Sequence, residues 1–328
     1  MFRGGGKAAL LAVLLAAVAV VAGCAGIQES EPIIPVSEYE KLIVGRLDAN
    51  YVGDQACLAK CHAHDQIKKW FDASTMGAQL SSDSGLPLVN CESCHGPGSL
   101  AIANIRVING RRTCDYSTFI DLKHLPKQAQ SLICLKCHTQ NATFSLHYWN
   151  TSKHNLSGVS CFDCHNVHKG VDLKVGRRNV AQLCYKCHPE IKAQFSLPNH
   201  HPVNEGAVTC LDCHDPMGSP NRYMLKDGSM KELCGNCHAE KTGPFAFEHG
   251  DVTEKCVNCH RPHGSVNQHL LKVRLPYLCY QCHEAQHPVT NDYPNQNQWA
   301  HTICTDCHSE IHGSDTPGLF SNGGTFTR

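Results

Sequence analysis

Cysteine and histidine recur together at regular spacing along this chain. Of its 328 residues, 22 are Cys and 23 are His. Two thiols three residues apart lie on one helical turn, so both can bond to one flat ligand, and a His that follows can bind a metal at its centre. Such Cys-x-x-Cys-His motifs are typical of covalently attached haem c. Nine motifs begin at Cys91, Cys134, Cys161, Cys184, Cys210, Cys234, Cys256, Cys279 and Cys304.

A tenth motif is irregular. Cys57-Leu-Ala-Lys-Cys61-His62 has three residues between its thiols. Because the following His is kept, we expect a haem here as well, and a disulfide between Cys57 and Cys61 is the alternative. Cys114 belongs to no motif, and we expect it to be a small buried residue without a role.

The motifs together predict ten haems c with the following ligands. The predicted thioethers form at Cys57, Cys61, Cys91, Cys94, Cys134, Cys137, Cys161, Cys164, Cys184, Cys187, Cys210, Cys213, Cys234, Cys237, Cys256, Cys259, Cys279, Cys282, Cys304 and Cys307. The predicted proximal iron ligands are His62, His95, His138, His165, His188, His214, His238, His260, His283 and His308.

Other cysteine chemistries explain this pattern less well. An adjacent Cys-His pair suits the tetrahedral geometry of zinc poorly. A disulfide scaffold accounts for the number of Cys but not for a His after every second one. A thioredoxin-like redox motif occurs once, on a βαβ scaffold that this sequence does not show.

Thirteen further His residues exceed by three the sixth ligands that ten irons require. Several recur at fixed places, three or four residues after a proximal His or seven to nine residues before the second motif of a pair. A His that follows a proximal His so closely cannot reach the far face of the haem held by its own motif, so it is expected to bind a neighbouring haem. The predicted distal ligands are His154, His168, His200, His201, His249, His263, His287, His301 and His312. No repeat supports His64, His124, His147 or His269.

Two methionines stand where the repeats otherwise place a distal His. Aligning Trp70 with Trp149 puts Met76 opposite His154, and aligning the Cys213 and Cys259 segments puts Met217 opposite His263. Both are lower-ranking candidates for a sixth ligand, and a Met ligand raises the haem potential. The alternative is that a spare His nearby takes the role.

The motifs fall into five pairs, at residues 57–95, 134–165, 184–214, 234–260 and 279–308. From the second pair on, the pair starts recur every 45 to 50 residues, and repeats at such a period usually stack in a row. The 252 residues from Cys57 to His308 allow about 25 per motif, one short helix and a loop. We therefore expect an elongated multihaem fold of short α-helices and irregular backbone wrapped around a row of haems, with little or no β-sheet.

The N-terminus resembles an export signal of the lipoprotein type. Arg3 and Lys7 precede an apolar run at 8–21 that is too short to span a bilayer. Val-Ala-Gly-Cys at 21–24 predicts cleavage at 1–23 and lipidation of Cys24, with an incidental Cys as the alternative. Residues 24–50 are expected to form a tether, 51–313 the decahaem domain and 314–328 a tail.

Charge excludes one class of partner. The formal net charge is zero, so no basic surface for nucleic acid is expected. The propionates of ten haems would make the loaded protein acidic.

The sequence resembles the decahaem cytochromes of the MtrA and DmsE kind over about residues 50–313. The segments that carry the resemblance are Tyr-Val-Gly-Asp at 51–54, Cys-Glu-Ser-Cys-His-Gly-Pro-Gly-Ser at 91–99, Leu-Pro-Asn-His-His-Pro-Val at 197–203 and Cys-His-Arg-Pro-His-Gly-Ser at 259–265. This resemblance implies a periplasmic haem wire that passes electrons through an outer-membrane porin, with periplasmic or surface cytochromes as further partners. The lipid anchor, the Cys57 motif and the two methionines depart from the family pattern.

We therefore expect an electron carrier rather than an enzyme, exported to the periplasmic face of the outer membrane or, alternatively, to the cell surface. A surface cytochrome that reduces minerals, or a filament subunit, shares the same chemistry at another location. A multihaem reductase of a small oxyanion is the second alternative. Such enzymes commonly leave one iron open or replace a proximal His by Lys, whereas all ten motifs here keep His.

Overall fold

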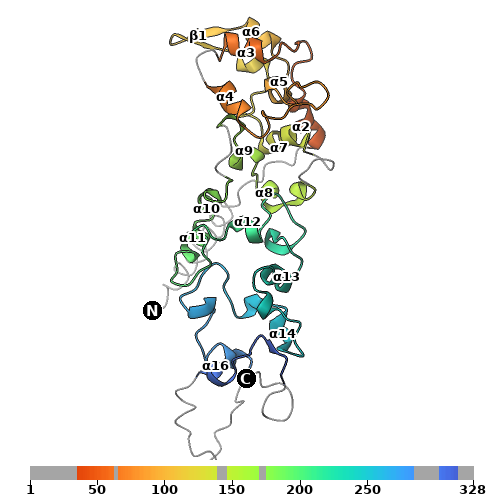
Figure 1. Ribbon diagram of the computed structural model, residues 1–328. Coiled ribbons are helices and arrows are strands. Elements are labelled where there is room, and N and C mark those ends of the chain that lie inside the picture. The colour runs from red at the N-terminus through yellow and green to blue at the C-terminus, as the bar shows by residue number, and fades with distance from the viewer. Residues whose placement is uncertain (1–34, 63–65, 139–145, 170–174, 284–302, 317–328) are drawn as a thin grey trace, which may run out of the picture.

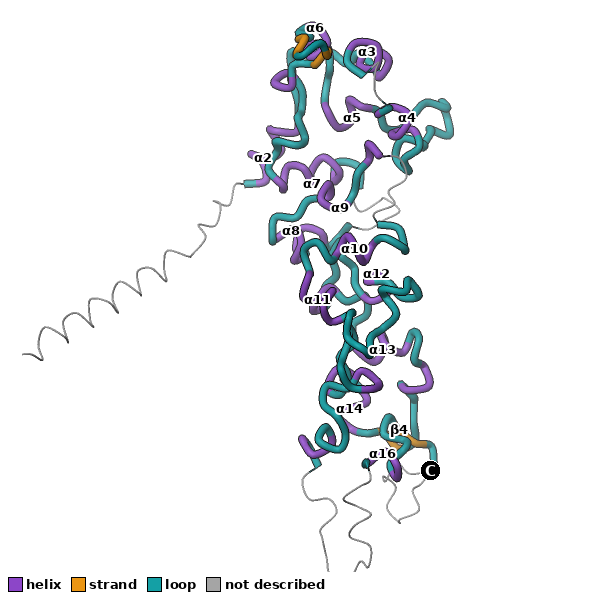
Figure 2. Tube along the Cα trace, turned by 90° about the vertical axis from the view of Figure 1, so that its left-hand side faces the viewer, coloured by secondary structure: helices purple, strands orange, loops and turns teal. Residues whose placement is uncertain are grey.

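The structure, a computed structural model, describes residues 35–62, 66–138, 146–169, 175–283 and 303–316. It is elongated, and the chain runs from one end of the long axis to the other (Figures 1 and 2). The Cys57 region lies at one end and the Cys304 region at the other (Figure 1). Short helices and irregular backbone dominate, which confirms the predicted fold class.

The helices are four to nine residues long or consist of single 3₁₀ turns. The α-helices are α2 (Val36–Ile43), α3 (Asp54–Lys60), α4 (Ile67–Asp72), α5 (Cys91–His95), α6 (Ser99–Ala103), α7 (Lys127–Leu135), α8 (Lys153–Leu156), α9 (Cys161–Cys164), α10 (Val180–Cys184), α11 (Pro189–Gln194), α12 (Cys210–Cys213), α13 (Met230–Gly235), α14 (Gly250–Thr253) and α16 (Cys304–Cys307). The 3₁₀ turns are η1 (Tyr116–Thr118), η2 (Trp149–Thr151), η3 (Val167–Lys169), η4 (Arg222–Met224), η5 (Ala239–Lys241), η6 (Cys256–Asn258), η7 (Gln268–Leu270) and η8 (Cys279–Gln281).

Helices α9 and α12 coincide with Cys-x-x-Cys, and their boundaries have a local cause. Asp163 accepts a hydrogen bond from the backbone N–H of Ser160 at 2.7 Å, and Asp212 does the same for Thr209. These carboxylates fix the first turn, as in a capping box. At the next residue the backbone becomes extended, with ψ of 146° at His165 and 145° at His214. Each helix is therefore one turn that presents two thiols and then leads away through the His.

Sheet is confined to two antiparallel pairs of short strands in the described ranges. Strands β1 (Arg106–Ile108) and β2 (Arg111–Thr113) form a hairpin through Asn109 and Gly110, both at positive φ, as its two-residue turn requires. Strands β3 (Phe247–Glu248) and β4 (Gly313–Ser314) pair across more than sixty residues. The second pair joins the final segment to the preceding repeat.

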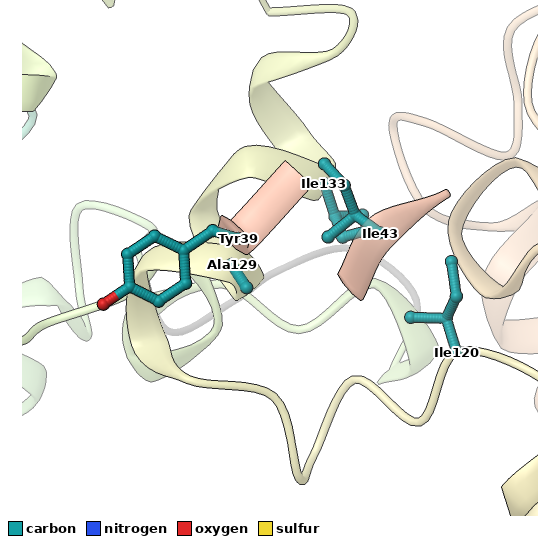
Figure 3. Packing of buried hydrophobic residues seen from close by; sticks show 5 residues of the cluster. All are labelled: Tyr39, Ile43, Ile120, Ala129 and Ile133. Carbon is teal, nitrogen blue, oxygen red and sulfur yellow. The ribbon is translucent and has the colours of Figure 1, made fainter. Parts of the chain in front are cut away.

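Aliphatic packing is limited to small separate clusters. Tyr39 and Ile43 of α2 pack with Ala129 and Ile133 of α7 and with Ile120 (Figure 3). A second cluster contains Ala181, Tyr185, Phe195 and Val203. Only fifteen hydrophobic side chains are buried in the part of the chain that the structure describes. Clusters of this size cannot form a continuous interior along an elongated molecule.

The first cluster corrects the expected extent of the tether. Residues 24–50 were predicted to connect a lipid to the first motif, but α2 is a helix held against α7, and Lys136 Nζ donates to the Ile43 carbonyl at 2.8 Å. Tyr39 and Ile43 are four residues apart and so lie on the same face of α2, which explains why this face packs against α7. Only residues before Pro35 remain available as a tether.

The export signal, Cys24 and the end of the C-terminal tail lie outside the described residues. Within those residues, no helix is both long and apolar enough to cross a membrane.

Shortening Ile133 tests the role of the first cluster. Ile133→Ala should weaken the local packing of α2 and α7 by about 3 kcal/mol, because it leaves a cavity among side chains that cannot all move in. Amide hydrogen exchange in both helices should accelerate accordingly. Val44→Ala, at an exposed position beside α2, is the control and should leave exchange unchanged. Equal exchange in the two variants would contradict the assignment.

Candidate haem-binding sites

Proximal His rings from six motifs each face a second His ring from a distant segment. The ring centroids are 6.1 Å apart for His95–His168, 6.3 Å for His154–His188, 6.2 Å for His201–His238, 6.2 Å for His214–His263, 5.9 Å for His249–His283 and 6.2 Å for His260–His312. Each pair joins one predicted proximal ligand to one predicted distal ligand.

This separation fits one iron between two imidazoles. An imidazole nitrogen binds a first-row metal at about 2 Å, and the ring centroid lies about 1 Å behind it, so rings on opposite sides of one iron are about 6 Å apart. Rings stacked directly on one another would lie closer. The six pairs therefore have the spacing that axial ligation of a haem iron requires.

Backbone carbonyls orient both members of these pairs. Among proximal rings, Nδ1 donates to a carbonyl in His95, His214 and His260, at 2.7 to 3.0 Å. Among distal rings the same bond occurs at His154, His201 and His249, to Pro216, Pro262 and Ile311. Since a carbonyl only accepts, Nδ1 carries the proton and Nε2 has its lone pair free for a metal.

Burial favours the neutral, metal-binding form of several rings. It lowers the pKa of His95, His260, His263 and His312 below the ordinary value for His. An imidazole must be neutral to bind a metal, so this shift favours ligation at neutral pH.

The distal ligands follow one connection rule for each kind of motif. Within each pair, the motif nearer the N-terminus is the first motif and the other is the second motif. A His that follows the second motif of one pair faces the proximal His in the second motif of the preceding pair, as His263 faces His214 and His312 faces His260. A His before a second motif faces the proximal His of the next first motif, as His154 faces His188. Every such pair therefore joins one repeat to its neighbour.

The thiols of the two motifs within each pair also interact with one another. Cys134 donates a hydrogen bond to Cys161, which raises the pKa of Cys134 and lowers that of Cys161 to about 7. Cys184 and Cys210 interact in the same way. The corresponding neighbours elsewhere are Cys57 and Cys91, Cys234 and Cys256, and Cys279 and Cys304.

Electrostatic interactions between thiols also link successive pairs. Burial raises the pKa of Cys94, Cys213 and Cys259, and in each case a thiol of the next pair adds to the shift. These neighbours are Cys94 and Cys137, Cys164 and Cys184, Cys213 and Cys237, and Cys259 and Cys282. The two kinds of interaction alternate from Cys57 to Cys304, which is the order expected if porphyrins bonded to these thiols lie in one row.

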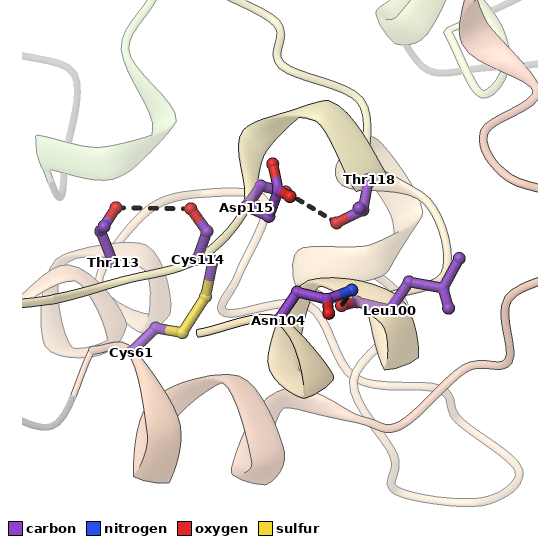
Figure 4. The surroundings of a disulfide bond; sticks show 7 residues. All are labelled: Cys61, Leu100, Asn104, Thr113, Cys114, Asp115 and Thr118. Carbon is purple, nitrogen blue, oxygen red and sulfur yellow. Dashed lines mark hydrogen bonds between the residues drawn. A yellow bond between two sulfur atoms is a disulfide. The ribbon is translucent and has the colours of Figure 1, made fainter. Parts of the chain in front are cut away.

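The irregular motif at Cys57 differs from the prediction. Cys61 forms a disulfide with Cys114, whose Cα lies 6.3 Å away (Figure 4). A sulfur in a disulfide cannot also form a thioether, so the expected thioether at Cys61 and the expected lack of a role for Cys114 are both wrong in this structure. The predicted alternative, a disulfide between Cys57 and Cys61, is not formed either.

The extra residue of the Cys57 motif explains why Cys61, and not Cys57, forms the disulfide. The backbone N–H groups of Cys61 and His62 both donate to the Cys57 carbonyl, at 2.9 and 3.2 Å. In regular motifs the His makes this bond, as His138 does to Cys134 at 3.0 Å. The insertion is thus absorbed as a one-residue bulge. Cys57 and His62 keep their relation, while Cys61 turns toward the segment after β2.

The remaining candidates are not brought opposite a proximal ring by any contact in the described residues. His200 interacts with Glu205 and with the Leu197 carbonyl. His124 pairs with Asp121, and the ring of exposed His147 packs on Tyr148. His269 contributes its backbone carbonyl to His260.

Three predicted ligands and the weaker candidate His64 lie beyond what the structure shows. His64, His287 and His301 are outside the described residues, and the side chain of Cys307 is likewise not described. Met76 and Met217 are described and half-buried.

Sequence reasoning missed the carbonyls that orient the rings, and no residue type signals them. It also missed the partner of Cys61, for which the unassigned Cys114 was the available signal. Across the described ranges, no three His, Cys, Asp or Glu side chains converge as they would around a single bare metal ion.

Comparison with known proteins identifies the same kind of repeat. Residues 154–193, 200–243 and 249–288 match the family described as the doubled CXXCH motif. Each segment contains a predicted distal His together with the proximal His that faces it, for example His154 and His188. The chain is also 35% identical over 275 residues to the multihaem cytochrome MtrA of Shewanella baltica (strain OS185), covering 81% of this chain and 79% of the relative.

Removing one distal ring tests the paired geometry. His168→Ala should leave the iron opposite His95 five-coordinate, so one haem equivalent becomes high-spin and binds carbon monoxide when reduced. Electron paramagnetic resonance of the oxidised protein measures the change. His124→Ala is the control, because this exposed ring pairs with Asp121 instead. A high-spin signal in both variants, or in neither, would rule the pairing out.

Peptide mapping without reduction tests the disulfide at the Cys57 motif. We expect a cross-linked peptide containing Cys61 and Cys114, with haem bonded to Cys57 alone. Cys114→Ser should remove the cross-link and about 4 kcal/mol of chain-entropy stabilisation for a loop of this length. Haem bonded to both Cys57 and Cys61, with Cys114 a free thiol, would refute the disulfide.

Proposed function

The chain belongs to the family of MtrA-like multihaem cytochromes, and on that premise we propose that it carries electrons along its haems as the cytochrome of a porin–cytochrome conduit. The conduit would connect the periplasm to acceptors or donors outside the cell. The observation that supports this most directly is the series of facing His rings, from His95–His168 to His260–His312, each of which joins one repeat to its neighbour.

Paired ligands favour electron transfer over catalysis. Haem c supplies reversible one-electron iron chemistry when bound. At the six facing pairs two His residues would hold the iron, which would leave no position there for a substrate. The rings are also fixed by carbonyls such as those of Ile120 and Pro216, so they need not move when the charge on the metal changes.

The shape suits a conduit. The described motifs extend along one axis and the first and last lie at opposite ends (Figure 1). A narrow row of this kind can enter a membrane pore lengthwise, with one end on each side. No described helix provides such a pore, so a porin partner would supply it.

Location at the periplasmic face of the outer membrane is part of the proposal. Lipidation at Cys24 would hold the chain there by residues 24–34, ahead of the docked helix α2. Ten haems are proposed in total, including one at Cys57 and His62.

Reconstitution tests the conduit. Holoprotein produced together with a family porin is placed in vesicles that enclose methyl viologen, and dithionite is added outside. The viologen should be reduced only when porin and cytochrome are both present. The double variant Cys210→Ala, Cys213→Ala, which lacks one haem in the middle of the row, should slow this transfer by orders of magnitude.

Two results would count against the proposal. Unchanged transfer in the double variant would show that the row is not the path. Failure to associate with a porin, combined with protease sensitivity on intact cells, would identify a surface cytochrome instead.

A further inference from the structure

We propose that methionine supplies the sixth ligand at both haems of the second pair, Met217 opposite His165 and Met76 opposite His138. This inference rests on the proposed haem row and adds the identity of two ligands within it. It concerns the proximal ligands of the second pair, His138 and His165, to which the connection rules lead from Met76 and Met217.

The connection rule for second motifs leads from Met217 to His165. His168 faces His95, His263 faces His214, and His312 faces His260, each one second motif back along the chain. Met217 is the residue three positions after the proximal His214, as His263 is after His260. One second motif back from it lies Cys161-Phe-Asp-Cys164-His165.

The backbone around Met217 repeats that around His263. His214 Nδ1 donates to the Tyr223 carbonyl at 2.9 Å, and His260 Nδ1 to the His269 carbonyl at 2.7 Å. The hydroxyls of Ser219 and Ser265 donate to the carbonyls of Leu225 and Leu271, both at 2.5 Å. Every partner is shifted by 46 residues.

Further bonds continue the match. The backbone N–H of Lys226 donates to the Cys213 carbonyl and that of Lys272 to the Cys259 carbonyl, at 3.0 and 2.8 Å. The positive φ angles of Tyr223 and His269, 60° and 56°, also correspond. Residues 217 and 263 therefore occupy the same place in one local frame.

Contacts with the preceding repeat match as well. His154 Nδ1 donates to the carbonyl of Pro216, and His201 Nδ1 to that of Pro262, in each case the residue before the ligand position. The glycines that follow allow close backbone approach: a Cβ on Gly218 would lie 2.5 Å from the Tyr148 carbonyl, and one on Gly264 2.0 Å from that of Gln194. Met217 is therefore held against its neighbouring repeat as His263 is.

Met76 lies in a turn that matches the one carrying His154. Buried Ser74 accepts from the backbone N–H of Gly77, and buried Ser152 accepts from that of Asn155, both at 3.1 Å. The ligand position is two residues after the serine in each case. The backbone N–H of Ser74 bonds to Phe71 and that of Ser152 to Trp149, so Phe71 and not Trp70 is the counterpart of Trp149.

The rule for first motifs leads from Met76 to His138. His154, His201 and His249 each face the proximal His of the next first motif, namely His188, His238 and His283. The same step from the turn before Cys91 reaches the motif at Cys134. Helix α4, which leads into Met76, packs against η3, the turn that carries His168.

The described spare imidazoles near these positions are engaged elsewhere. His147 is exposed and its ring lies 4.9 Å from the Tyr148 ring. His124, near the Cys134 motif, is exposed and bonded to Asp121 at 2.7 Å. In both places the ligand position itself holds a half-buried thioether, Met76 or Met217.

The consequence is a local change of potential within the row. Replacing His by Met as sixth ligand raises the reduction potential of a c-type haem. The two affected haems would be neighbours, because the thiols of Cys134 and Cys161 touch. Because a higher potential favours the reduced state, electrons in the row would occupy these two haems in preference to the others.

Three variants of the holoprotein test the assignment. The oxidised wild type should show the sulfur-to-iron charge-transfer band at the red end of the visible spectrum. Met217→His should halve its intensity, and Met76→His with Met217→His should abolish it, while all haems stay low-spin. In a potentiometric titration, two haem equivalents should move from the high-potential end to lower potential. His147→Ala, the matched control, should change neither readout.

Absence of the band from the wild type, or its persistence at full intensity in the double variant, would overturn the inference. Either result in a protein that still carries its haems and transfers electrons leaves the proposed function standing. Loss of haem from the wild type would instead remove the proposed function itself.

Discussion

Two imidazoles about 6 Å apart, one on each side of a shared position for iron, are the contact on which the rest of this molecule depends. In each of the six facing pairs the two His residues come from different repeats, for example His214 and His263. A metal bound by both acts as a cross-link between segments that otherwise touch through few side chains. The order of the repeats along the axis then follows from which His faces which.

Covalent attachment makes such a fold possible with little aliphatic packing. The apolar clusters around Ile133 and Phe195 are small and separate, and most helices last one or two turns. A helix this short is unstable by itself, because nucleation fixes several residues for one hydrogen bond. Thioethers at both ends of a turn and an axial His beside it supply the constraint that packing does not. The fold and the haem row are in this sense one structure.

The N-terminal part of the row departs most from the repeat. It contains the bulged Cys57 motif, the disulfide between Cys61 and Cys114, and the two methionines in ligand turns. In the two methionine turns the local hydrogen bonds are those of regular repeats, so the backbone frame is kept while the ligand is exchanged. At Cys57 the frame instead absorbs one extra residue as a bulge. Such exchanges alter how a haem is held, and at what potential, without changing where it lies.

Sequence alone determined the chemistry, because Cys-x-x-Cys-His places two thiols and an imidazole within one turn, and that is a local property of the chain. The paired spacing likewise predicted short helices and an elongated row. Tertiary structure decided the partners: His168 could have faced any nearby iron, and only the packing of distant segments sets it opposite His95. The same holds for Cys61, whose partner 53 residues away depends on a one-residue bulge and on the hairpin that carries Cys114 past it. Spacing fixes what a residue can bind, and non-local contacts fix what it meets.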